Sequence, residues 1–185
     1  MAKISDKHGK IIFIEGIWGS GKTTLIKVLK KIAAGKVKLL KEPSHLLFLK
    51  NGSPEKITNW YINAHYKNIR KAVGLIKTND IVLVERSPLS SIAFMGAYLN
   101  KNNSYLNKEI RRLEKELVRI SNTNKTTFLY LRKNTARALS QLNSKPYLKQ
   151  LASKRLLSIL SQNMERNLLK LKKKSVINLH ILKYE

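Results

Sequence analysis

Residues 11–25 read IIFIEGIWGSGKTTL, and this stretch decides the fold of the chain. Its first four residues are β-branched or aromatic, a run too short for a helix and apolar throughout, which indicates a parallel strand buried on both faces. Residues 16–23 then match the pattern G-x-x-x-x-G-K-[ST] without a gap. Apolar residues recur at helical spacing from Leu25 to Ile32, and Gly35 follows where that helix would end. The pattern therefore stands between a strand and a helix, which is the context in which it binds phosphate.

The spacing of this pattern has a physical reason. Its glycines let the backbone turn so tightly that successive N–H groups face phosphate oxygens, beside the positive end of the following helix. Lys22 is expected to reach the β- and γ-phosphates, and the Thr23 hydroxyl to ligate Mg²⁺. The sequence predicts a nucleoside triphosphate site formed by Gly16, Ile17, Trp18, Gly19, Ser20, Gly21, Lys22, Thr23 and Thr24.

Length and composition limit the class of protein. The 185 residues are 43% hydrophobic, which is typical of a folded globular chain, and we expect one domain over residues 1–185. No apolar run approaches the roughly 18 residues that a membrane span needs. The polar first ten residues do not have the pattern of a signal peptide, and the chain has no cysteine for a disulfide or a thiolate metal site. These features indicate a cytoplasmic protein that does not contact a membrane.

The net charge is unusually positive. Thirty-seven Lys and Arg stand against eleven Asp and Glu, which leaves +26 at neutral pH. Such a charge favours polyanions, nucleic acid above all. However, the basic residues are scattered, and only residues 172–174 form a tight run, as a lysine-rich composition would also give. Nucleic acid is therefore a possible partner but not the favoured one.

Strand and helix patterns alternate along the chain. Apolar runs predict strands at 11–14, 37–40, 81–84, 127–131 and 176–179. Helical periodicity, with Ser53 and Asn134 as N-caps, predicts helices at about 54–77, 88–98, 106–120, 135–142 and 148–171. This alternation predicts an α/β fold, in which a five-stranded parallel sheet is covered by helices on both faces, as in P-loop NTPases.

In such a sheet, ligands bind at the carboxyl ends of the strands. That edge gathers Glu42, Glu85, Arg86 and Arg132 beside the phosphate-binding pattern. Glu85 follows a run of four apolar residues, where an acid would hold Mg²⁺ directly or through water. The alternative is a carboxylate that caps the next helix. Arg86 could stabilise charge on a transferring phosphate, and it could also form an ion pair with Glu42 or Glu85.

Four segments resemble one superfamily of phosphotransferases. Glu15-Gly16 leading into Gly19-Ser20-Gly21-Lys22-Thr23-Thr24 resembles the phosphate loop of thymidylate kinases and deoxynucleoside kinases. Lys41-Glu42-Pro43 resembles the R-E-P of the former and the E-P of the latter. Residues 85–97, ERSPLSSIAFMGA, are similar to D-R-Y-x-x-S-S-x-A-Y-Q-G-A of thymidylate kinases, although E-R-S and the later Tyr130-Leu131-Arg132 resemble deoxynucleoside kinases. The resemblance spans residues 11–142.

The resemblance implies a nucleotide-kinase-like fold and phosphoryl transfer from ATP with Mg²⁺. It implies Lys22, Arg86 and Glu42 as catalytic residues, with Thr23 and Glu85 as metal ligands. A short lid at about 133–147 would use Arg132, Arg137 and Lys145. Met95 stands where thymidylate kinases carry a glutamine that helps to read thymine, and His65 replaces an arginine.

Relatives of this kind are commonly dimers, and the apolar side of the helix at 88–98 could form such an interface.

The acceptor depends on the role of Glu42. A nucleoside 5′-hydroxyl gains from a carboxylate base, whereas a nucleoside monophosphate brings its own anionic oxygen. We expect a nucleoside monophosphate, thymidylate first, because the match at 85–97 is the longer one. The alternative is a deoxynucleoside kinase, and a further alternative is a P-loop ATPase that binds nucleic acid. Substrate-binding candidates are Glu42, Tyr61, His65, Arg86 and Phe94, although aromatic residues at helical spacing are more often core.

Overall fold

The computed structural model describes residues 9–33, 35–43, 52–99, 101–121, 125–142 and 152–184. Five strands form one sheet in the order β2-β3-β1-β4-β5, and every neighbouring pair is parallel. Their bounds are β1 Lys10–Glu15, β2 Val37–Leu40, β3 Ile81–Glu85, β4 Lys125–Lys133 and β5 Asn178–Tyr184. Strand β1 lies at the centre, so the loop that follows it leaves from the middle of the sheet.

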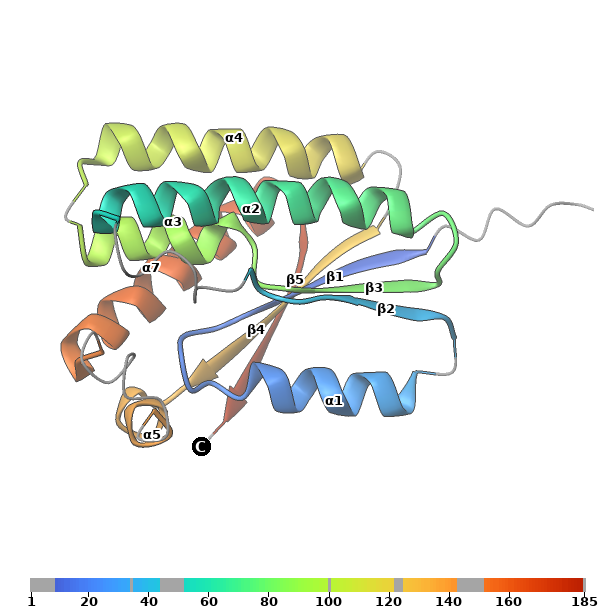
Figure 1. The fold of residues 1–185 in the computed structure, drawn as a ribbon, viewed down its shortest axis with the longest axis horizontal. Helices are drawn as coiled ribbons and strands as arrows, with labels where there is room; N and C mark the ends of the chain where they lie inside the picture. The colour runs from blue at the N-terminus through green and yellow to red at the C-terminus, as the bar shows by residue number, and fades with distance from the viewer. Residues whose placement is uncertain are drawn as a thin grey trace, which may run out of the picture.

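The helices lie on both faces of this sheet. Helix α1 (Lys22–Ile32) packs on one face, and α2 (Pro54–Leu75), α3 (Pro88–Ala97), α4 (Asn103–Ser121) and α7 (Lys154–Lys173) cover the other (Figure 1). The short α5 (Thr135–Ser140) follows the carboxyl end of β4. This arrangement confirms the predicted three-layer α/β/α fold.

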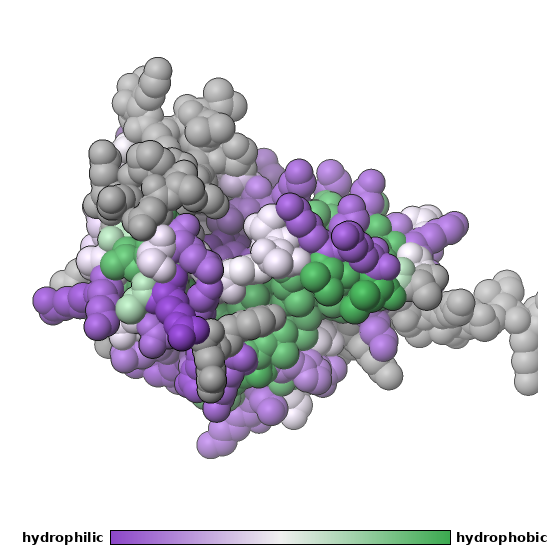
Figure 2. Space-filling model, turned by 90° about the horizontal axis from the view of Figure 1, so that it is seen from below, coloured by the Kyte–Doolittle hydropathy of each residue, from purple (hydrophilic) through white to green (hydrophobic). Residues whose placement is uncertain are grey.

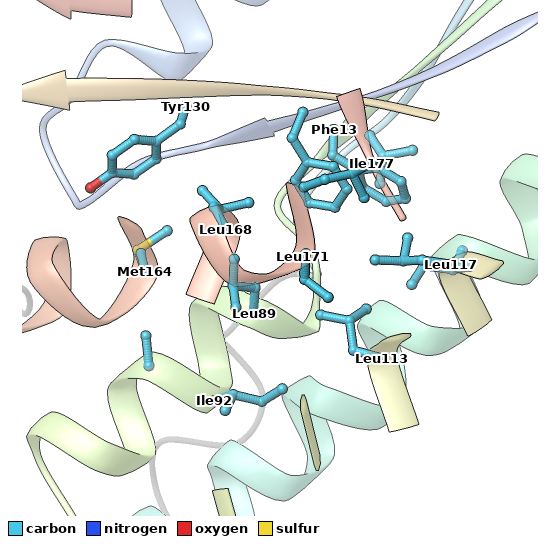
Figure 3. Packing of buried hydrophobic residues seen from close by; sticks show 14 of the residues in the cluster. Phe13, Leu89, Ile92, Leu113, Leu117, Tyr130, Met164, Leu168, Leu171 and Ile177 are labelled. Atoms are coloured by element: carbon cyan, nitrogen blue, oxygen red, sulfur yellow. The ribbon is translucent and has the colours of Figure 1, made fainter. Parts of the chain in front are cut away.

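The core lies mainly between the sheet and the larger helical layer. Phe13 of β1 stacks on Phe128 of β4 with ring centroids 4.7 Å apart, and both are fully buried. Leucines of α3, α4 and α7 pack beneath them (Figure 3). The α1 side has a smaller cluster, and its surface shows a band of apolar residues (Figure 2). The two faces of β1 are therefore both buried, as its apolar sequence requires.

Most predicted elements are confirmed within a few residues. Ser53 and Asn134 cap α2 and α5 as expected, because their side chains accept backbone N–H groups of the first turn. The last strand is placed wrongly by the sequence, because β5 begins at Asn178 and runs to Tyr184. The residues before it form the turn after α7, in which the N–H of Val176 donates to Leu171 O. The expected chain break at 143–146 and the expected start of the last long helix at 148 lie outside the described residues, and the structure describes that helix from Lys154.

The predicted dimer surface on α3 is wrong as stated. Its apolar residues Leu89, Ile92, Ala93 and Met95 are buried within the chain, where α3 contacts α2, α4 and α7. That side is therefore not available to a second copy. Within the described part of the chain, no helix is both long and apolar enough to cross a membrane.

Candidate functional site

The phosphate loop, residues 16–23, connects the central strand to α1. Gly19 and Gly21 have φ of 72° and 90°, the left-handed region that favours glycine. A Cβ on Gly19 would lie 2.3 Å from Ala138 O, so α5 packs directly against the loop. Gly21 is the N-cap residue of α1 and provides no side-chain cap. The N-terminus of this helix therefore meets the loop without a capping side chain, which is the arrangement that binds phosphate.

Lys22 is folded back over the loop. Its Nζ donates to Gly16 O at 3.1 Å and to Ile17 O at 2.9 Å, and the side chain is buried. The pKa of Lys22 is lowered to about 7. Burial is the main cause, and the nearby Arg86 guanidinium is the second. Thr23 and Thr24, in contrast, are exposed at the start of α1. The role of Thr23 as a metal ligand stays a prediction.

Glu42 and Arg86 form an ion pair next to the loop. The Nε of Arg86 lies 2.8 Å from Glu42 Oε1, so the ion pair expected from the sequence forms with Glu42. Burial by itself would raise the pKa of Glu42, but Arg86 and Lys22 outweigh it and hold this pKa below its usual value. The carboxylate is therefore ionised at neutral pH. A guanidinium, an ammonium and a carboxylate thus converge at the carboxyl edge of the sheet.

Glu15 is a site residue to which the sequence analysis assigned no role. It ends β1, is fully buried, and accepts hydrogen bonds from Ser87 N at 2.7 Å, Ser87 Oγ at 2.5 Å and Ser90 Oγ at 2.5 Å. Burial raises the pKa of Glu15, and Arg86 with the two serines opposes that rise. An acid directly after an apolar strand was the signal used for Glu85. The same signal at Glu15 could have found it.

Glu85 lies at the end of β3, in register with Ile14 of β1. It does not cap the next helix, because the N-cap of α3 is Ser87. Its charge opposes the lowering of the Lys22 pKa and contributes to the raised pKa of Arg86. Glu85 therefore lies near both groups. The described residues contain no group of three or more His, Asp or Glu that could hold a metal without another ligand. A Mg²⁺ site at Thr23 and Glu85 would therefore need phosphate oxygens as well, and it stays a prediction.

The aromatic candidates divide into two groups. His65 of α2 is buried, and its charge lowers the pKa of Glu42, so it lies near that carboxylate. The ring of Tyr61 lies 6.3 Å from that of His65. Phe94 of α3 meets Trp18 of the phosphate loop edge-on at 5.8 Å between ring centroids. These contacts place both groups beside the loop and Glu42, while their roles in binding a base stay predictions.

The predicted lid is only partly described. Arg132 is half-exposed and pairs with Glu165 of α7 through Nε at 2.8 Å and through Nη2. Arg137 is exposed on α5, next to the residue that packs against Gly19. Lys145 lies outside the described residues. Of the two lid candidates that the structure describes, Arg137 is the one on the helix that contacts the phosphate loop.

A separate groove of about 860 Å³ runs along α4, on the helical layer away from the α1 side. Basic side chains dominate its lining, with two glutamates among them: Lys108, Arg111, Arg112, Lys115, Arg119, Glu109 and Glu116. Nucleic-acid binding stays a prediction.

Comparisons with known proteins agree with this fold. A family model described as an AAA domain matches residues 11–153. A structure of deoxyadenosine kinase from M. mycoides with bound dATP is similar at a TM-score of 0.62 and 19% identity, covering 94% of this chain and 90% of that one. A second structure of that kinase, with the products dCMP and a flexible dCDP, is similar at a TM-score of 0.59 and 20% identity. It covers 95% of this chain and 90% of that one. At this identity the likeness shows the fold. No curated protein matches the sequence.

Proposed function

The chain belongs to the AAA domain family, and from that premise we propose that it transfers the γ-phosphoryl group of ATP to the 5′-hydroxyl of a deoxynucleoside. One observation carries the proposal. The ionised Glu42 lies 2.8 Å from Arg86, beside the buried Lys22 of the phosphate loop. The fold shared with a deoxyadenosine kinase supports this choice of acceptor.

Each residue has a role that its environment permits. Lys22 and Arg86 provide positive charge where negative charge spreads over the transferring group. Glu42 accepts the proton of the attacking hydroxyl, because its carboxylate is ionised before the substrate arrives. Thr23 and Glu85 offer the hydroxyl and carboxylate oxygens that suit Mg²⁺, which neutralises phosphate charge when bound. The helix α5, packed on Gly19, would belong to the lid that excludes water.

The second candidate acceptor is a nucleoside monophosphate such as dTMP. The similarity of residues 85–97 to thymidylate kinases favours it. Met95, at the position where those kinases carry a glutamine, is fully buried in the core and presents no polar group to a base. A monophosphate also leaves the ionised Glu42 without a proton to accept. We therefore rank the 5′-hydroxyl first.

An acceptor screen tests this choice. The chain is incubated with Mg·ATP and each common nucleoside or monophosphate, and ADP formation is measured. Glu42→Gln keeps the shape of the side chain and removes the base, so we expect transfer to a nucleoside to fall by about 10²–10⁴-fold. Glu114→Gln is the matched control, since Glu114 pairs with Lys174 elsewhere on the surface. ATP hydrolysis that no acceptor stimulates would contradict the proposal, and transfer to monophosphates alone would favour the second candidate.

A further inference from the structure

The carboxylate of Glu15 lies near the proposed catalytic residue Arg86 and does not reach the surface. It is 0% exposed, and both of its oxygens accept hydrogen bonds from α3 and the residue before it. We propose that Glu15 is a positioning residue, which acts through Ser90 to hold the Arg86 guanidinium against Glu42. This inference rests on the proposed function, because Arg86 and Glu42 matter as the groups that face the acceptor.

These hydrogen bonds run from Arg86 through Ser90 to Glu15. Arg86 can only donate, so Ser90 Oγ accepts from Arg86 Nη1 at 2.9 Å. The single hydroxyl hydrogen of Ser90 is then left to donate to Glu15 Oε2 at 2.5 Å. In the same way, Ser87 Oγ accepts from Leu89 N and gives its hydrogen to Glu15 Oε1. Both carboxylate oxygens of Glu15 therefore take part in the network, one with Ser87 and the other with Ser90.

Arg86 needs such support because its backbone is strained. Its φ is 66°, which a residue with a Cβ keeps only where its surroundings hold it. The Arg86 N–H donates to Ile14 O at 3.1 Å on one side. On the other side, Glu15 binds both the backbone N–H and the hydroxyl of Ser87, the next residue. Glu15 therefore fixes the turn from which the Arg86 side chain departs.

The same bonds fix the guanidinium itself. Its Nη1 donates to Gly16 O at 3.0 Å as well as to Ser90, and its Nε faces Glu42. Gly16 O also accepts from Lys22, so the two cations meet at one carbonyl of the phosphate loop. Burial by itself would lower the pKa of Arg86, and Glu42 and then Glu15 raise it again. Without the charge of Glu15, Arg86 would face a less favourable field and lose the partner that orients it through Ser90.

Kinetics of three variants test the proposal. Ser90→Ala removes the link between Arg86 and Glu15 and leaves both charges, and we expect kcat/KM for the acceptor to fall at least tenfold. Glu15→Gln should lower it ten- to a hundredfold, with KM for ATP changed less than threefold. If Ser90 and Glu15 act through the same series of hydrogen bonds, the double variant should lose no more kcat/KM than Glu15→Gln alone. Additive losses, or wild-type kinetics in Ser90→Ala, would overturn the proposal.

A conservative rescue and a control separate positioning from general stability. Ser90→Thr keeps the hydroxyl and should restore kcat/KM to within threefold of the wild type. Glu114→Gln removes a carboxylate that pairs with Lys174 away from the site, and it should leave kcat/KM unchanged. A Ser90→Thr variant as impaired as Ser90→Ala would count against the hydroxyl bridge. Should Glu15→Gln fail to fold, the two Ser90 variants decide alone.

A second measurement does not depend on activity. The Nε–H of Arg86 is buried beside Glu42, so in ¹⁵N NMR spectra it should exchange with water slowly, and Arg86→Lys identifies its signal. We expect at least tenfold faster exchange in Ser90→Ala and in Glu15→Gln. Unchanged exchange in both would refute the positioning role. If the wild type transfers phosphate to no acceptor, the proposed function fails, and this measurement still decides whether Glu15 positions Arg86.

Discussion

Lys22 should make the nucleotide-free protein less stable at neutral pH than at alkaline pH. Its pKa is lowered from 10.5 to about 7, so between these values the unfolded chain binds a proton that the folded chain does not. Stability then rises with pH, because the free energy of unfolding increases wherever the unfolded state binds more protons. The full cost of burying the charge is present below pH 7 and is relieved towards pH 10.5. The amine of Lys22 thus opposes folding most strongly at neutral and acidic pH.

The size of the effect follows from the two pKa values. Each unit of separation corresponds to about 1.4 kcal/mol. Because the folded amine is half-protonated near pH 7, raising the pH from 7 to 9 should stabilise the protein by about 2 kcal/mol through Lys22 alone. Lys22→Met removes this contribution. The free energy of unfolding of the wild type minus that of the variant should therefore rise by this amount between pH 7 and 9, whatever the other groups contribute.

Urea unfolding followed by circular dichroism at several pH values measures the difference. Lys27→Met is the matched control, because Lys27 is an exposed lysine on the same helix. The difference between wild type and Lys27→Met should not show the 2 kcal/mol rise. A flat difference curve for Lys22→Met between pH 7 and 9 would refute the reasoning, since a lysine charged throughout this range contributes no slope. The absolute stability of the variant is less informative, because it also loses two hydrogen bonds to the loop.

Two further predictions concern the same loop. Nucleotide binding should recharge Lys22, so at pH 8 Mg·ATP should bind with an uptake of nearly one proton; calorimetry in Tris and in HEPES measures it, and equal uptake by Lys22→Met would contradict the assignment. Gly19→Ala should destabilise the fold by about 2 kcal/mol or more, because its φ is positive and its Cβ would meet Ala138 O at 2.3 Å. Gly74→Ala, where an added Cβ meets nothing within 4 Å on α2, should instead stabilise it by about 1 kcal/mol. Urea unfolding compares the two glycine variants, and a Gly19→Ala variant as stable as the wild type would show that α5 does not pack on the loop.

The sequence predicted most of the fold because its signals are local. Hydrophobic periodicity separated strands from helices, and Ser53 and Asn134 marked helix starts through bonds to their own first turns. Where a segment's role depended on distant contacts, the sequence misled. Val176 and Ile177 read as a strand, yet they complete the turn after α7 and pack in the core. The apolar side of α3 likewise read as a surface for a partner, although other helices of the chain cover it.

The sequence by itself determined the phosphate loop, because a tight turn of glycines between a strand and a helix needs only neighbours along the chain. It also determined that Glu42 and Arg86 lie at one edge, because parallel strands bring their carboxyl ends together. Only the tertiary structure decided that Arg86 pairs with Glu42, that Lys22 lies buried with a lowered pKa, and that Glu15 supports them through Ser90. Such pairings depend on burial and on distances between atoms far apart in sequence, and no local pattern encodes them.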